Sequence, residues 1–408
     1  MKPNARPTGR LADERGAILI QVAVALLALL ALSSFVFDYG VMWASRAQAQ
    51  NAADAGALSG AISLAFDDPD DFDGARAKAL AVARANNVWG EVPDVTAADV
   101  TFPACPPTPG MPADTCVKVD LFRNQRAGGN PLPTFFARLA GITEQGVRAT
   151  ATARVLVGDS ARCVKPWAVP DKWNDLRDTP QDGLWTPDDD FERYVQNGQN
   201  AGAVLTPTAD VYVPPGVTGH TGFTVEVDYG TALTLKHGNP QQAIRPGFFF
   251  PVVINPLEGP GGANYEQNIA TCDPTVIGPG DSLTVEPGNM VGPTNQGVAA
   301  LIAQDSGATW SPTANNGRGA PVGGCMTAGT CAVSPRLVAL AVFNPDTYDA
   351  ARAGGRTEVV VTKILGFWIQ GMQNNDVIGY LTHYPALAEG GNNVDPDAAF
   401  LTTVVLVR

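Results

Sequence analysis

The chain has 408 residues, of which 45% are hydrophobic and only 16% charged, and its formal net charge is −13. A sparsely charged, acidic chain without a Lys/Arg cluster lacks the cations that displace phosphate counterions, which excludes nucleic-acid binding. The length allows a sizeable buried core, and we expect two folded units. The 43 glycines and 33 prolines are spread evenly, which indicates many turns between short strands.

Residues 17–37 form an apolar run without a charged side chain. At 1.5 Å of rise per residue, a helix over this run is about 31 Å long, which matches a hydrocarbon core of about 30 Å. We therefore predict a transmembrane helix. A cleaved secretory signal is the competing interpretation, but the run is longer than the roughly 7–15 residues of an ordinary signal core.

Basic residues outnumber acidic ones before the apolar run. The charged residues there are Lys2, Arg6, Arg10, Asp13, Glu14 and Arg15. Beyond the run come Asp38, Arg46 and Asp54, with no basic excess. The positive-inside rule then places residues 1–16 in the cytoplasm as a short tail and the bulk of the chain on the other side of the membrane.

Good helix formers continue over residues 46–65, so the membrane helix is expected to extend into water as one long helix. The acidic run 67–74 ends it at Pro69, and a second helix is predicted over residues 75–87. An EF-hand with Gly74 at its sixth position would start at a proline, so we interpret the acidic run as a solvated turn.

Strict alternation predicts strands over residues 116–123 and 146–157. Between them, residues 131–141 predict a short helix with Thr134 as its N-cap. Residues 38–157 are therefore expected to form the projecting helix and a small α+β module packed on it.

Residues 158–408 are predicted to form a mainly β domain, because apolar runs rich in β-branched residues alternate with turn residues. The predicted strands are 223–237, 247–256, 335–343, 357–371 and 401–408. One helix interrupts them over residues 295–304, with Thr294 as its expected cap. The fold class predicted for the whole chain is α+β.

All six cysteines follow the apolar run. They are Cys105, Cys116, Cys163, Cys272, Cys325 and Cys331. An even number on the outer side of a membrane indicates disulfides, although six cysteines allow 15 pairings. Choosing nearest neighbours pairs the first two, the last two and the middle two. A zinc site is disfavoured, because no CxxC occurs and His220, His237 and His383 lie far from paired cysteines.

The N-terminal segment resembles that of TadG-like, and more loosely TadE-like, proteins of tight-adherence Flp pilus systems. The matching residues are Arg15, Gly16, the apolar run, Asp38, Gly40, Arg46 and the block 50–61, with Asn51, Asp54 and Gly60. The segments PTFFARLAGI, CVKPWAVPDKW and EPGNMVGPT are weaker likenesses. The resemblance implies a pilus-assembly and cell-adhesion role, a single span in the bacterial inner membrane and a periplasmic or extracellular bulk.

Such a helix needs small residues where it meets another helix. Ala53, Ala57 and Ala61 repeat at every fourth position, beside Gly56 and Gly60. This face is predicted to pack either on other pilin-like helices or on the chain's own module; both alternatives stay open.

Pilin-like proteins are cut after a glycine, which leaves Glu at the fifth position of the new N-terminus. A cut after Gly16 would make Ala17 the first residue and place Gln21 at the fifth position, without the charge. Processing is therefore an open hypothesis. Some related proteins also carry a von Willebrand factor A domain, but the nearest candidate here, Asp159-Ser160, lacks its spaced serines.

We find no GxSxG, P-loop, GxGxxG or HExxH pattern. The acidic cluster 187–193 could hold a glycosidase acid pair or a weak calcium ion, but an exposed turn is the simpler interpretation. Trp167, Trp173 and Trp185 could form a carbohydrate-stacking surface, although core packing is more common.

The sequence thus predicts a non-enzymatic, membrane-anchored component of Flp pilus assembly without a cofactor or metal. Its expected partners are the inner membrane and other pilin-like or assembly proteins. A membrane-tethered module that binds envelope glycan or protein is the alternative, and a tethered hydrolase is the third class.

Overall fold

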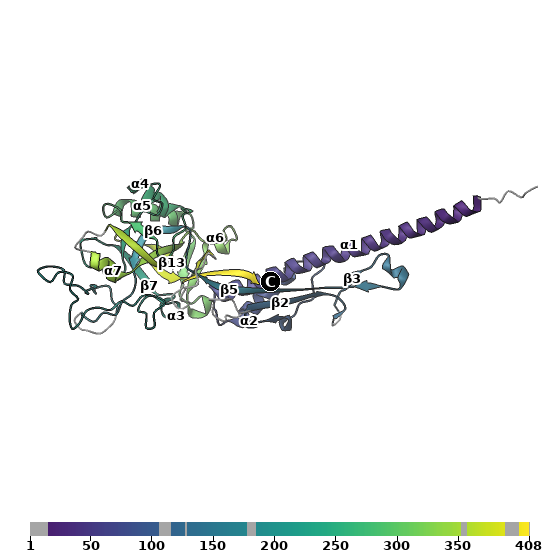
Figure 1. Cartoon of the computed structure of the whole chain (residues 1–408), viewed down its shortest axis with the longest axis horizontal. Coiled ribbons are helices and arrows are strands. Elements are labelled where there is room, and N and C mark those ends of the chain that lie inside the picture. Colours follow the sequence, from purple (N-terminus) through teal and green to yellow (C-terminus); the bar gives the residue numbers. More distant parts are fainter. Residues whose placement is uncertain are drawn as a thin grey trace, which may run out of the picture.

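The computed structural model describes residues 15–105, 116–126, 129–177, 185–351, 357–387 and 400–407. Residues 1–14 of the predicted cytoplasmic tail lie outside them. The molecule is elongated: one end of a long helix extends alone, and a large rounded body lies at the opposite end (Figure 1).

The long helix α1 covers Arg15–Phe66, 52 residues, and is about 78 Å long at 1.5 Å per residue. It has two unlike parts. Every described side chain from Ile18 to Phe37 is exposed, and this apolar part is the one helix among the described residues that is long and apolar enough to cross a membrane. From Val41 onward one face is buried against the rest of the chain.

The helix α2, Phe72–Ala85, packs on the second part of α1. Its N-cap is Asp71, whose carboxylate accepts a hydrogen bond from the backbone N–H of Gly74, so the acidic turn caps the helix as well as ending α1. The two helices approach closely because Gly56 and Gly60 lack side chains. A Cβ at Gly56 would lie 2.9 Å from Cβ of Ala83, and one at Gly60 would lie 3.2 Å from Cβ of Ala79.

A sheet in the order β1-β2-β5-β16-β15 covers the other side of α1. Its strands are β1 (Val100–Thr101), β2 (Cys116–Arg123), β5 (Val147–Gly158), β15 (Tyr384–Pro385) and β16 (Leu401–Val407). The strand β5 pairs with β2 over its first part and with β16 over its last part. The last strand of the chain therefore returns to complete this sheet, whose core is built from alanine and valine side chains.

Four short elements flank the module. The 3-10 helix η1 covers Ala97–Asp99, and a two-stranded ribbon of β3 (Leu132–Pro133) and β4 (Glu144–Gln145) carries the 3-10 helix η3 (Ala137–Ala140) at its tip.

The large body is built on a second sheet in the order β12-β6-β8-β7-β14-β13-β9. The additional pairing of β12 with β13 closes the strands from β12 to β13 into a ring around an aromatic-rich core. The strands are β6 (Val164–Pro170), β7 (Ala232–His237), β8 (Phe248–Pro251), β9 (Ser282–Thr284), β12 (Leu337–Phe343), β13 (Glu358–Gln373) and β14 (Asp376–Thr382).

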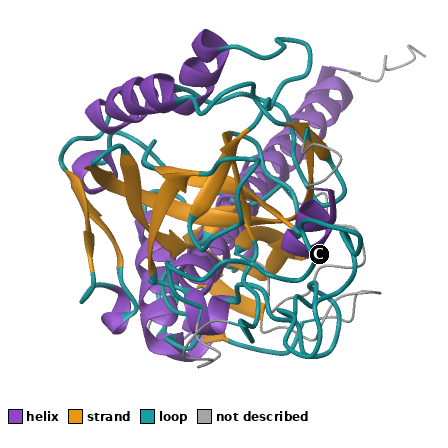
Figure 2. Ribbon diagram, turned by 90° about the vertical axis from the view of Figure 1, so that its left-hand side faces the viewer, coloured by secondary structure: helices purple, strands orange, loops and turns teal. Residues whose placement is uncertain are grey.

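Helices and a small ribbon surround this ring; Figure 2 shows strands across the centre of the body and helices at its edge. They are α3 (Val225–Asp228), α4 (Gly262–Ala270), α5 (Val291–Ala303), α6 (Gly324–Thr327), α7 (Pro345–Ala350), η4 (Asn315–Gly317), β10 (Ala308–Ser311) and β11 (Ala320–Gly323). The overall class is α+β with a mainly β C-terminal part, as predicted.

The six cysteines form the disulfides Cys105–Cys116, Cys163–Cys272 and Cys325–Cys331. These are the nearest-neighbour pairs. The middle bridge joins the start of β6 to the end of α4 and closes the longest loop, with 109 residues of sequence separation.

Several local predictions need correction. The helix predicted from residue 295 begins earlier, at Val291, and Thr294 lies buried inside it instead of capping it. Its Oγ1 donates to the backbone oxygen of Met290. Pro293 is tolerated because the first turn of a helix needs no intrahelical N–H donor. The predicted strand 223–237 starts only at Ala232, because α3 occupies its first residues. The helix α4 was not predicted.

Candidate functional site

The site that joins the projecting helix to the folded module is centred on Asp38, the first residue after the apolar part of α1. One oxygen of its carboxylate, Oδ1, accepts a hydrogen bond from the backbone N–H of Phe135 at 2.7 Å. The other, Oδ2, accepts from the N–H groups of Phe136 at 3.0 Å and Ala137 at 2.6 Å. The backbone oxygen of Asp38 also accepts from Nε2 of Gln145 at 3.3 Å. We call these four contacts the Asp38 clamp.

The clamp takes the place of a local helix cap. The first N–H groups of a helical turn have no partner within the turn, and a carboxylate satisfies them with charge-assisted bonds. Thr134, the cap predicted from the sequence, instead donates its hydroxyl to the backbone oxygen of Ile142 at 2.8 Å. The prediction was wrong because the actual cap comes from a residue 97 positions away.

The loop held by the clamp, residues 134–142, presents apolar side chains to the surroundings. Phe135 is 56% exposed, Phe136 37% and Ile142 54%. The ring of Phe136 lies 5.8 Å from that of Phe37, centroid to centroid. Gly141 ends η3 at a φ of +83°, a conformation that glycine adopts without steric cost.

A hollow of about 560 Å³ lies between this loop and α1. It is lined mostly by apolar side chains. They include Ala31, Phe35 and Met42 from the helix and Phe136 and Ile142 from the loop. The loop therefore reaches back beside the apolar part of α1 instead of stopping at its end.

The other residues of the N-terminal motif fall into three environments. Gln21, Gly40, Arg46 and Asn51 are exposed. Arg46 lines a second, larger hollow of about 1020 Å³ between α1 and the first residues of β5. Asp54 accepts a hydrogen bond from Nε2 of Gln50, and this amide also donates to the backbone oxygen of Thr150. Gly60 is buried under α2 and β2.

The small-residue face of the helix is occupied by the chain itself. Ala53, Ala57 and Ala61 are fully buried in the core of the module, together with Ala75 and Ala79 of α2. Of the two alternatives that the sequence left open, the structure therefore shows packing on the chain's own module.

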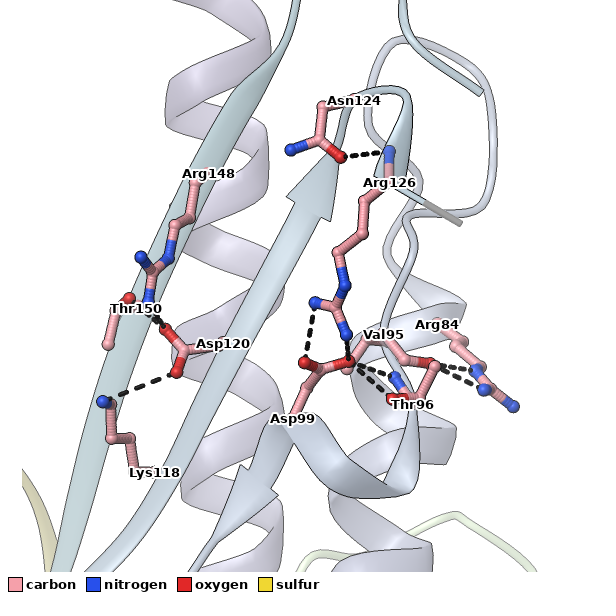
Figure 3. A network of polar contacts seen from close by, with 10 residues as sticks. All are labelled: Arg84, Val95, Thr96, Asp99, Lys118, Asp120, Asn124, Arg126, Arg148 and Thr150. Atoms are coloured by element: carbon pink, nitrogen blue, oxygen red, sulfur yellow. Dashed lines mark hydrogen bonds and ion pairs between the residues drawn. The ribbon is translucent and has the colours of Figure 1, made fainter. Parts of the chain in front are cut away.

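Ion pairs secure the outer surface of the module, as Figure 3 shows. Asp120 on β2 pairs with Arg148 on β5 at 2.8 Å and accepts from the hydroxyl of Thr150. Burial alone would raise the pKa of Asp120, but the hydrogen bonds from Thr150 and Arg148 and the charge of Lys118 outweigh it and lower this pKa. Asp99 and Arg126 form a second pair at 2.7 Å. Each charge has a partner, which indicates a structural role.

The acidic cluster 187–193 does not converge on one point. Asp189 accepts from the N–H and hydroxyl groups of Thr186, whereas Asp190 pairs with Arg245 and Glu192 with Arg177. Within the described ranges, no group of three or more His, Cys, Asp or Glu side chains is placed to hold a metal ion.

The histidines are separated in the structure. His383 is buried between Phe66 and Tyr229, and burial lowers its pKa to about 4. The ring of His237 packs against Phe249, 4.5 Å between centroids. Asp159, from the nearest candidate for a von Willebrand factor A motif, accepts a hydrogen bond from the hydroxyl of Ser160 at 3.0 Å.

Trp167 and Trp173 are core residues, fully enclosed in the large body. Trp185 is half-buried and packs edge-to-face on Trp173 and Phe223. A hollow of about 800 Å³ lies beside this aromatic cluster, and Lys172 and Asp228, an ion pair at 2.8 Å, contribute to its wall.

Fold and clamp together define a class of protein with one long N-terminal helix, apolar and exposed at its start and built into an α+β module further on. Residues 16–63 match the model of a family described as "Tad: Putative Flp pilus-assembly TadE/G-like". This confirms the resemblance seen in the N-terminal segment, and the family is one of pilus assembly and not of enzymes. Neither a curated protein nor a solved structure matches the chain.

The matched segment contains Asp38 but none of the groups that it binds. Sequence reasoning singled out both Asp38 and the segment PTFFARLAGI without connecting them. The backbone N–H groups of residues 135–137 carry no side-chain signature, so only their common resemblance to one family could have suggested the contact.

Proposed function

We propose that this protein is a non-enzymatic, membrane-anchored component of Flp-type pilus assembly in the bacterial inner membrane. The family match at residues 16–63, together with the exposed apolar part of α1, carries this proposal. An apolar helix surface of this length is stable only when lipid or another apolar helix covers it. The basic excess before it supports a cytoplasmic N-terminus and a periplasmic or exported body.

In this proposal the protein acts by anchoring and spacing. Residues 17–37 lie in the bilayer, and the buried part of α1 from Asp38 to Phe66 forms a rigid stalk about 44 Å long. The clamp, α2 and the sheet hold that stalk along most of its length. The large body is thereby presented at a set distance from the membrane, where assembly partners meet it.

Contacts with other pilin-like helices are proposed for the exposed part of α1, because the alanine face further on is filled by the chain's own module. Three disulfides, one in the small module and two in the large body, suit an oxidising compartment such as the periplasm.

Cleavage after Gly16 stays a proposal. The mature N-terminus decides it: Ala17 as the first residue indicates pilin-like export, whereas an intact start indicates permanent residence in the membrane. Gln21→Glu, which restores the usual charge at the fifth position, is the matched variant and should increase any processing.

Two experiments test the proposal. Deletion of the gene should abolish or reduce piliation, and the intact chain should restore it, whereas a chain with Leu26 and Leu27 replaced by Asp should not. A reporter enzyme fused after Arg408 should be active in the periplasm. Normal pili in the deletion strain, or a reporter active only in the cytosol, would contradict the proposed role or orientation respectively.

The second candidate is a membrane-tethered module that binds an envelope glycan. The hollow beside Trp185 favours it, because a partly exposed indole next to polar groups is a surface on which a sugar can stack. A glycan-array signal that disappears in Trp185→Ala would support this function. Trp89→Ala, which changes another partly exposed tryptophan in the small module, is the control.

A further inference from the structure

The loop 134–142 lies beside the end of the apolar run, which marks the edge of the bilayer if α1 spans it as proposed above. The clamp ties the backbone of Phe135, Phe136 and Ala137 to Asp38, which is the first residue after the apolar run. The loop cannot move away from the end of the run without breaking these three hydrogen bonds.

The hollow between the loop and α1 shows how far the loop reaches. Its walls include Ala31 on the helix and Ile142 on the loop. Ala31 precedes Phe37 by six positions, which is about 9 Å along a helix. The loop therefore overlaps the last turns of the apolar run, at the depth of about 5–10 Å where amphipathic segments enter the headgroup and acyl boundary.

The side chains of the loop suit that depth. Phe135, Phe136 and Ile142 are exposed although they are large and apolar. Arg138, in the same loop, is exposed and adds a positive charge. On the helix, Tyr39 and Trp43 are exposed just beyond Asp38. Tyr and Trp rings within the first turns beyond an apolar run are typical of a membrane interface.

We propose that residues 134–142 form a second membrane contact, in which Phe135, Phe136 and Ile142 enter the lipid leaflet nearest the folded body and Arg138 meets lipid phosphates. Continuity with the exposed apolar part of α1 favours lipid over a protein partner, since both surfaces face the same surroundings at the same level. This second contact fixes the rotation and tilt of α1 in the membrane, and so sets the orientation of the large body relative to the membrane surface.

Site-directed spin labelling tests the proposal on the full chain. The six native cysteines all form disulfides, so one introduced cysteine is the single thiol available for a nitroxide. Phe135→Cys and Ile142→Cys report on the loop, Leu26→Cys on the apolar run, and Val92→Cys, another exposed apolar position of the module, on water. The chain is placed in nanodiscs of phosphatidylethanolamine and phosphatidylglycerol, and collisions with oxygen and with a water-soluble nickel chelate are compared.

The labels at Phe135 and Ile142 should shift towards Leu26, with more oxygen and less nickel collision than at Val92. Labels that match Val92, while the one at Leu26 is in lipid, would overturn the second contact and leave the anchor intact. A label at Leu26 that is itself in water would overturn both. Protection from oxygen and nickel together, with spin–spin broadening between copies, would show a protein contact and refute the lipid assignment.

Discussion

Gly60 in α1 allows the packing of the stalk to be tested with one methyl group. A Cβ there would lie 2.8 Å from Cγ1 of Val117, 3.2 Å from Cβ of Ala79 and 3.3 Å from the backbone oxygen of Ala75. Val117 is fully buried in β2. Cβ of Ala79 and the backbone oxygen of Ala75 both belong to α2. None of the three can move aside freely.

The expected change in the free energy of unfolding on Gly60→Ala has two opposing contributions. Replacing glycine by alanine inside a helix stabilises it by about 1 kcal/mol. Forcing an extra methyl group into a filled core costs about 1–3 kcal/mol. Gly60→Ala should therefore lower the free energy of unfolding by up to about 2 kcal/mol. Gly40→Ala, in the same helix, has no atom within 4 Å of the new Cβ and should raise it by up to about 1 kcal/mol.

Thermal unfolding of the full chain in detergent micelles measures the sign of each change, and hydrogen exchange of the α2 amides over Phe72–Ala85 locates it. Gly60→Ala should lower the melting temperature and speed exchange in α2, whereas Gly40→Ala should do neither. Equal stabilisation by both substitutions would refute the close packing of α2 and β2 on α1 at Gly60.

Three further outcomes are expected. Asp38→Asn should speed hydrogen exchange of the backbone amides of residues 135–137, because it removes the charge and one of the two oxygen acceptors. Asp54→Asn should leave the exchange rates of these amides unchanged. Replacing Cys163 and Cys272 by Ser opens a loop of 109 residues and should lower the free energy of unfolding by roughly 4–5 kcal/mol. Thermal unfolding at constant pH measures this, and an unchanged melting temperature would contradict the bridge. Burial lowers the pKa of Lys165 to about 7, so above that pH the unfolded chain binds more protons than the folded chain. The free energy of unfolding should therefore rise from pH 7 to 9 by at most about 1.4 kcal/mol per pH unit. A rise equally steep in Lys165→Met would refute the assignment of this pH dependence to Lys165.

Lys165 also illustrates how a buried lysine is accommodated in this fold. Its ammonium group donates to the backbone oxygens of Asn268 and Thr271 at the end of α4. Unpaired carbonyl groups at a helix C-terminus attract a cation. The segment CVKPWAVPDKW was recognised in the sequence, but α4 was not, so its partner could not be foreseen.

Local patterns sufficed where a property depends on neighbours in the chain. The apolar run from Ala17 to Phe37 predicted a transmembrane helix from its length and lack of charge, and the structure contains a continuous helix there that is long and apolar enough to be one. Alternation predicted β2 and β5 nearly to their ends, since one face of each packs on α1. The spacing of the cysteines led to the same pairs that the structure contains.

Tertiary structure alone decided how these pieces combine. No local pattern shows that β16 returns to β5, or that β12 pairs with β13 to close the ring, because any apolar strand can pair with any other. Thr134 had the expected chemistry of a cap, yet Asp38, which lies 97 positions before Phe135 in the chain, fills that role. A periodic pattern states which face of an element is apolar, whereas the partner of a given polar group depends on where distant elements come to lie.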